Sequence, residues 1–343
     1  MKKYLLYSFI TLLALFTVAC GKSTPTTGEP ENPDALTVYT TVYPLTYFTQ
    51  RIGGNNVHVE SVYPAGSNEH TFDPTQKDMM DLADADLFFY VGLGLEGFVD
   101  NAKKTLANED VTMVATADEV TDEELAMSQG HEDEHGHEDD GHEEGHDEGD
   151  EEGHANEDNG HENHDHGETD PHLWISPQIS MKLASSIKNS LIEKDPKNEA
   201  TYTKNYEALI AELEQLDADF KEMVDASSNK TFFVSHAAFG YLAGTYGLEQ
   251  VAVAGLNSQD EPSQQELTEI VKLAKEKNIT TILFEQNVSS NLTKVIQNEV
   301  GADAMTLHNL GVLTKEDIDN KETYFTLMEQ NLETLKKALA SAK

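Results

Sequence analysis

The chain of 343 residues contains a single cysteine, Cys20. An intrachain disulfide is therefore excluded, and so is a zinc site built from several thiolates. A metal ion bound in a shaped site must be held by nitrogen and oxygen ligands, which leaves histidine, aspartate and glutamate as the side chains to examine.

Basic residues are also scarce. The chain has 23 lysines and arginines against 63 aspartates and glutamates, for a formal net charge of −40. Nucleic acid is excluded as a partner, because phosphate binding needs clustered basic side chains. Such an acidic chain is better suited to binding cations.

No apolar run is long enough to span a membrane comfortably. The longest, residues 4–16, follows Lys2 and Lys3 and precedes small residues before Cys20, as in an export signal. We therefore predict a signal peptide over 1–19 and a lipid on Cys20, anchoring the protein at the outer face of the cytoplasmic membrane of a Gram-positive-type bacterium. Thr17 stands where leucine is more usual, so a plain secreted protein is the alternative.

Residues 130–168 hold eighteen carboxylates and nine of the fourteen histidines, with no lysine or arginine. The tract has almost nothing apolar to bury, so we expect a disordered loop whose weak ligands collect metal; a solvated loop without function is the alternative. Two matches to the HExxH pattern, at 131–135 and 142–146, lack the apolar stripe of a helix and are attributed to composition. The accessory histidines are His131, His135, His137, His142, His146, His154, His161, His164 and His166.

Strand and helix patterns alternate along the rest of the chain, which predicts an α/β protein with mainly parallel sheets. We expect a flexible tether over 20–34, an N-terminal α/β lobe over 35–196 that includes the tract, and a C-terminal lobe over 228–343. A long rigid linker helix over 197–227 would join the lobes. The expected strands are 36–41, 57–63, 86–91, 231–235, 250–254, 280–284 and 304–307. The expected helices are 44–52, 75–83, 178–194, 198–225, 237–246, 263–277, 291–300 and 321–340.

Five histidines lie outside the tract. His70 and His236 follow predicted strands, as Glu285 does, and His172 lies in the dense element 170–177. Ligands of parallel α/β sheets bind beyond the carboxyl ends of the strands, so a shared metal site in the cleft between the lobes is one hypothesis. A lone histidine after a strand is otherwise a structural hydrogen-bonding residue, the reading adopted for His58 and His308.

The sequence resembles the zinc-binding lipoproteins of the cluster 9 (A-I) solute-binding family of ABC transporters, the ZnuA/AdcA-like group. The resemblance covers about residues 36–338. The segments that carry it are 40–44 (Thr-Thr-Val-Tyr-Pro), 68–74 (Asn-Glu-His-Thr-Phe-Asp-Pro), 84–87 (Asp-Ala-Asp-Leu), 170–177 (Asp-Pro-His-Leu-Trp-Ile-Ser-Pro), 235–242 (Ser-His-Ala-Ala-Phe-Gly-Tyr-Leu), Gly255 with 261–263 (Glu-Pro-Ser), and 284–290 (Phe-Glu-Gln-Asn-Val-Ser-Ser).

The resemblance implies Zn(II) ligation by His70, His172 and His236, completed by Glu285 or water. Glu69 is a competing oxygen donor, and Asp170 is expected to orient His172. Manganese-binding relatives tend to carry a carboxylate at the position of His236, and imidazole suits zinc better.

The function implied is that of a monomeric receptor, not an enzyme, which delivers Zn(II) to the permease of an ABC importer. A manganese receptor of the same family and a zinc-dependent hydrolase are the alternatives. Adhesion is a third class, suggested by surface anchoring alone.

Overall fold

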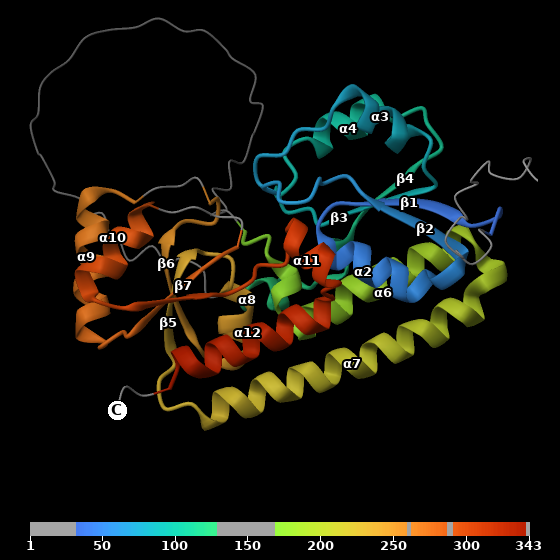
Figure 1. Cartoon of the computed structure of the whole chain (residues 1–343). Coiled ribbons are helices and arrows are strands. Elements are labelled where there is room, and N and C mark those ends of the chain that lie inside the picture. The colour runs from blue at the N-terminus through green and yellow to red at the C-terminus, as the bar shows by residue number, and fades with distance from the viewer. Residues whose placement is uncertain (1–31, 129–168, 259–261, 287–290, 341–343) are drawn as a thin grey trace, which may run out of the picture. The chain divides into compact units, whose positions relative to one another are not determined.

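Figure 1 shows the computed structural model of the chain, which describes residues 32–128, 169–258, 262–286 and 291–340. Within Ala35–Lys343, the described residues form one compact unit. The predicted signal peptide, Cys20, the tract 130–168 and nearly all of the predicted tether lie outside the described residues, so these predictions stay predictions.

The first lobe is built on a parallel sheet with the strand order β2-β1-β3-β4. Its strands are β1 (Leu36–Thr40), β2 (Val57–Ser61), β3 (Leu87–Tyr90) and β4 (Thr112–Ala115), and its helices are α2 (Tyr43–Gly53), α3 (Gln76–Ala83), α4 (Val99–Thr105) and α5 (Asp122–Leu125). All four residues of β3 are buried, as expected for a central strand covered on both faces.

The second lobe repeats this plan with the order β6-β5-β7-β8, again parallel throughout. Its strands are β5 (Thr231–His236), β6 (Glu249–Ala254), β7 (Thr281–Phe284) and β8 (Asp303–Thr306), and its helices include α8 (Gly240–Tyr246), α9 (Gln264–Glu276) and α10 (Asn291–Val300). Ser263 caps α9 by accepting a hydrogen bond from the backbone N–H of Glu266.

Two long helices follow the tract: α6 (Pro177–Lys194) and α7 (Glu199–Ala226). The expected long helix is α7, of 28 residues, and its buried stripe includes Leu209, Leu213 and Phe220. Early in α7, Asn205 donates to the backbone carbonyl of Ile52 in the first lobe at 3.0 Å. Near its end, Phe220 stacks on Tyr246 of the second lobe, with ring centroids 5.6 Å apart. The helix thus contacts both lobes.

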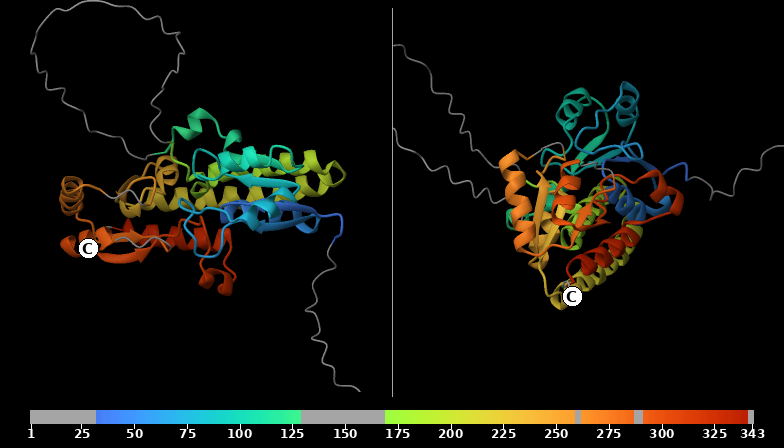
Figure 2. Two further views of the ribbon diagram at one scale, coloured as in Figure 1. Left: turned by 90° about the horizontal axis from the view of Figure 1, so that it is seen from above. Right: turned by 60° about the vertical axis from the view of Figure 1, so that its left-hand side comes forward.

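A second crossing between the lobes follows β8, in addition to the long helix α7 that was predicted to join them. Helices α11 (Lys315–Asn320) and α12 (Tyr324–Ala338) return to the first lobe, and α12 lies beside α7 (Figure 1, Figure 2). The Tyr324 ring packs edge-on against Phe48 of α2, with ring centroids 4.9 Å apart. The Tyr324 hydroxyl donates to the backbone carbonyl of Trp174 at 3.0 Å. Sequence periodicity predicts α12 but not which lobe it covers.

Four short elements were not predicted from the sequence: β4, α4, α5 and α11. These elements have four to seven residues each, too few for a periodic apolar pattern to stand out. Strand β4 is an edge strand whose residues are only partly buried or exposed, so its composition resembles that of a loop.

Glu96 ties the carboxyl ends of two neighbouring strands together inside the first lobe. Its buried carboxylate accepts hydrogen bonds from the backbone N–H groups of Val91 at 2.8 Å and Gly92 at 3.0 Å, and from the Thr41 hydroxyl at 2.8 Å. Burial raises the pKa of Glu96. Because each buried donor needs an acceptor, this one side chain fixes the loops that follow β1 and β3.

We expect Glu96→Ala to lower the free energy of unfolding by about 3 kcal/mol, because three buried donors lose their acceptor. Glu96→Gln keeps the volume and an acceptor oxygen and should lose less. Urea unfolding followed by circular dichroism measures both variants. Equal midpoints for wild type and Glu96→Ala would show that the carboxylate is dispensable.

Candidate metal centre

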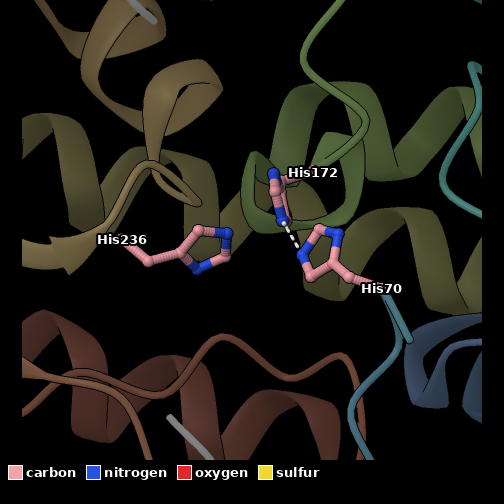
Figure 3. A group of neighbouring side chains, drawn as sticks. All are labelled: His70, His172 and His236. Carbon is pink, nitrogen blue, oxygen red and sulfur yellow. Dashed lines mark hydrogen bonds between the residues drawn. The ribbon is translucent and has the colours of Figure 1, made fainter. Parts of the chain in front are cut away.

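Three histidines from separate parts of the chain meet between the lobes. His70 lies in the loop between β2 and α3, His172 directly precedes the turn Leu173–Ile175, and His236 is the last residue of β5. One ring nitrogen of each lies within 4.8 Å of those of the other two (Figure 3). His172 and His236 are fully buried, and His70 is partly buried.

The spacing of the ring nitrogens suits a single small cation. The Nε2 atoms of His70 and His172 are 3.2 Å apart. Two nitrogens bound tetrahedrally to one zinc ion are about 3.3 Å apart, given a Zn–N distance of about 2.05 Å. His236 lies close to both, with its ring centroid 5.2 Å from that of His70 and 4.9 Å from that of His172. Little movement is needed for the three imidazoles to share one ion.

The two histidines of the first lobe are held by neighbouring side chains. Asn68 Oδ1 accepts the backbone N–H of His70 at 2.9 Å, and Asn68 Nδ2 donates to Ser258 Oγ of the second lobe at 3.0 Å. Asp170 Oδ1 lies 2.8 Å from Nδ1 of His172 and accepts the backbone N–H of the same residue at 2.9 Å. Asp170 thus lies where an orienting carboxylate is expected, and Nε2 of His172 faces Nε2 of His70 in the cluster.

Glu285 follows β7 and pairs with His236 at the reversal point of the strand order. Its Oε2 lies 2.9 Å from Nδ1 of His236, and Oε1 accepts the Ser235 hydroxyl at 3.1 Å. The carboxylate therefore orients the ring and is not part of the group of three. Direct ligation by Glu285 stays a prediction.

The second ring nitrogen of His236 already has a partner. Nε2 lies 2.9 Å from the backbone carbonyl of Leu256, in the loop after β6. Burial lowers the pKa of His236, but the Glu285 carboxylate and this carbonyl outweigh burial and raise the pKa to about 9. Burial would raise the pKa of Glu285, but the charge of His236 and its hydrogen bond hold the pKa below its usual range. The two side chains form a buried ion pair.

The other residues singled out in the sequence differ from His236 in their surroundings. Burial, together with the charges of His172 and His236, lowers the pKa of His70 to about 2, so this ring is neutral and ready to bind metal. Glu69 is buried and burial raises its pKa, but it lies outside the group of three. His58 and His308 stand apart, as expected, each paired with a carboxylate: Glu60 at 3.0 Å and Asp317 at 3.1 Å, respectively.

Several groups that surround the cluster were not predicted from the sequence. Asn309 donates to both Glu69 and Glu285, Ser235 supports Glu285, and the carbonyl of Leu256 engages His236. None of these has a local signal: Asn309 follows the last strand by three residues, and a backbone carbonyl carries no side-chain signature.

The fold and the site together define the class of protein. It has two α/β lobes, each with a parallel sheet, and three imidazoles between the lobes are spaced to hold one cation. The sequence profile of the ZnuA family, described as zinc-uptake complex component A, periplasmic, matches residues 38–338. The chain belongs to this family.

Individual relatives match nearly the whole chain. The zinc-binding lipoprotein AdcA of Streptococcus pneumoniae strain R6 is 36% identical over 327 residues, which cover 95% of this chain and 59% of AdcA. The high-affinity zinc uptake system protein ZnuA of Bacillus subtilis is 35% identical over 325 residues, which cover 95% of this chain and 94% of ZnuA.

A solved structure shares the fold. The crystal structure of the Zn(II)-bound ZnuA-like domain of S. pneumoniae AdcA superimposes with a TM-score of 0.69 at 31% identity, covering 90% of this chain and 100% of that domain. The likeness spans both lobes.

The ion pair predicts how metal binding depends on pH. A metal ion on Nε2 of His236 displaces the proton that this ring holds below its pKa of about 9, whereas His70 is already neutral. At pH values well below 9, binding should therefore release about one proton, and zinc affinity should fall about tenfold for each unit by which pH is lowered. Calorimetry in buffers of different ionisation enthalpy counts the protons. A binding enthalpy that is independent of the buffer would contradict this assignment.

Proposed function

We propose that this protein is an extracytoplasmic receptor that binds Zn(II) and delivers it to the permease of an ABC importer. The observation that carries the proposal is the convergence of three histidine nitrogens, from both lobes, within 4.8 Å of one another. Imidazole-rich shells suit zinc better than manganese, which prefers carboxylate oxygen. The relatives are named for zinc binding and zinc uptake.

In the proposed site, His70, His172 and His236 bind zinc through Nε2. Their Nδ1 atoms lie away from the ion, and two of them face the carboxylates of Asp170 and Glu285. The fourth position falls to water, or to Glu285 once its carboxylate leaves Nδ1 of His236. Such a shell is tetrahedral and needs no thiolate.

Zinc capture and release both involve the loop after β6. A nitrogen cannot donate to a carbonyl and bind a metal with the same orbital, so zinc reaches His236 only when Nε2 leaves the Leu256 carbonyl. When zinc departs, that carbonyl lies next to the ring as its alternative partner. We propose that permease docking shifts this balance towards release.

The hydrolase alternative finds no support in the side chains around the cluster. A catalytic zinc needs a nearby base to activate its water. Glu285 and Asp170 accept hydrogen bonds from histidines, and Glu69 accepts one from the Asn309 amide. Each of these carboxylates is thus engaged with a neighbouring side chain, and none is singled out as that base.

The proposed receptor acts outside the cytoplasm as a monomer, tethered by a lipid on Cys20 to the outer face of the membrane of a Gram-positive-type bacterium. Among the described residues, no helix is both long and apolar enough to cross a bilayer. The naming of AdcA as a lipoprotein supports the lipid anchor.

Single substitutions test the site directly. We expect His70→Ala, His172→Ala and His236→Ala each to weaken zinc binding at least a hundredfold, because each removes one ligand. Glu285→Gln should weaken it by about tenfold to a hundredfold, as loss of an orienting carboxylate commonly does. Competition with a chromophoric chelator gives the dissociation constants. His58→Ala is the matched control, because His58 is exposed and pairs with Glu60. An unchanged constant in any variant of the three histidines removes that residue from the site.

The tract 130–168 is proposed to collect metal near the tight site. Deleting it should leave one high-affinity zinc equivalent and abolish additional weak ones, because its nine histidines supply only weak ligands. Calorimetric titration of the full chain and the deletion variant compares the stoichiometries. Equal stoichiometry in the two proteins rules out the collecting role.

A further inference from the structure

The apolar core of the protein divides along the second sheet and not between the lobes. Successive side chains of a strand point to opposite faces of its sheet. Phe232 and Val234 of β5, with Leu283 of β7, belong to a core that continues into the first lobe, which we call the main core. Phe233 of β5 and Ile282 of β7 lie on the opposite face, in a second core. One face of the second sheet is therefore packed together with the first lobe, and the other face is packed separately.

Helices α9 and α10 lie side by side on this separately packed face (Figure 1), and we call them the α9–α10 layer. Each helix contributes one buried apolar residue to the second core, Ala274 from α9 and Ile296 from α10, and their other apolar residues in this core are only partly buried. Helix α7, by contrast, buries seven side chains in the main core. Because hydrophobic stabilisation scales with buried apolar area, the layer is held less strongly than the helices of the main core.

Polar contacts anchor the α9–α10 layer at the end of the sheet opposite the metal centre. Lys277, directly after α9, donates to the Thr231 hydroxyl at 3.2 Å and forms an ion pair with Glu249. Thr231 begins β5 and Glu249 begins β6, whereas His236 ends β5. The two ends of this six-residue strand are about 17 Å apart, at about 3.3 Å per residue. The anchor is therefore well separated from the imidazole cluster.

The loops that enter the layer at its other end contact the metal centre. Leu256, whose carbonyl lies 2.9 Å from Nε2 of His236, is in the connection from β6 to α9. Glu285, whose carboxylate lies 2.9 Å from Nδ1 of the same ring, is in the connection from β7 to α10. Both ring nitrogens of His236 are thus engaged by segments that lead into the layer. A rotation of the layer about its anchored end would move both segments together.

We infer that the α9–α10 layer opens as a unit separate from the rest of the fold, about the anchor at Lys277, and that this opening sets the rate of zinc release. Opening draws the Glu285 carboxylate away from Nδ1 of His236, so the ring is free to turn away from the ion. The first lobe, α7 and α12 share the main core and keep their positions. This inference rests on the proposed zinc-binding function and names the moving part that controls release.

Native-state hydrogen exchange of the full wild-type chain at increasing urea concentrations, read by mass spectrometry, tests the separate opening. Amides of α9 and α10 should share one opening reaction and exchange about tenfold or more faster than those of α6 and α12, because only the second core has to open. Exchange of all four helices at one common rate, through global unfolding, overturns the inference.

Ile296→Ala tests the link to zinc release, because it removes the buried side chain that α10 contributes to the second core. Exchange of α9 and α10 should rise about tenfold or more, since a cavity in this small core favours opening. Zinc release into excess chelator, followed by stopped flow, should speed up by a similar factor. Ile296→Val should shift both rates in the same direction by a smaller factor and serves if the alanine variant fails to fold. Faster exchange with an unchanged release rate overturns the inference.

Leu191→Ala is the matched control. Leu191 of α6 is as fully buried as Ile296, but it lies in the main core, and its truncation removes the same number of carbon atoms. It should lower the urea midpoint and leave both the exchange of α9 and α10 and the release of zinc unchanged. An equal rise in this control would show that general loosening is responsible and would overturn the inference. Failure of the wild type to bind zinc would instead refute the proposed function, whereas the exchange experiment decides the separate opening without metal, so the two failures are distinguishable.

Discussion

A buried line of hydrogen bonds runs from His236 through Glu285 and Asn309 to Glu69, and the geometry of the centre depends on it. Each link engages a group that would be costly to bury alone: an imidazolium, two carboxylates and an amide. Together the links turn the His236 ring so that Nε2 faces the other histidines (Figure 3). They also connect the two lobes where a cation would be held.

The fold positions the residues of this hydrogen-bonded line. Each lobe is a parallel sheet, so the carboxyl ends of its strands face one edge and carry the loops that hold polar side chains. Helix α7 contacts both lobes, and α12 returns to the first lobe after the last strand, so the chain links the lobes twice. A receptor for a small ion needs such stiffness, because a displacement of half an ångström is a large part of a metal–ligand bond.

Much of the fold and part of the candidate site were predictable from local sequence patterns. Alternating strands and helices indicated the α/β class and all strands but β4, and polar residues directly after buried strands singled out His236 and Glu285. The expectation that His70, His172 and His236 share one ion required the resemblance to a known family, since spacing alone left a structural role open for each histidine. The contacts of Asn309 and the carbonyl of Leu256 had no local signal, because both arise from segments far apart in the chain.

The sequence by itself determined the class of fold, the exclusion of thiolate ligands, and the residue types available to a metal, since periodicity and composition are local properties. Only the tertiary structure decided which nitrogen of each histidine faces the others, that Glu285 turns towards Nδ1 of His236, and that Glu69 and Glu285 share one amide. Those choices depend on hydrogen-bond geometry between distant segments, which exists only once the lobes have packed together.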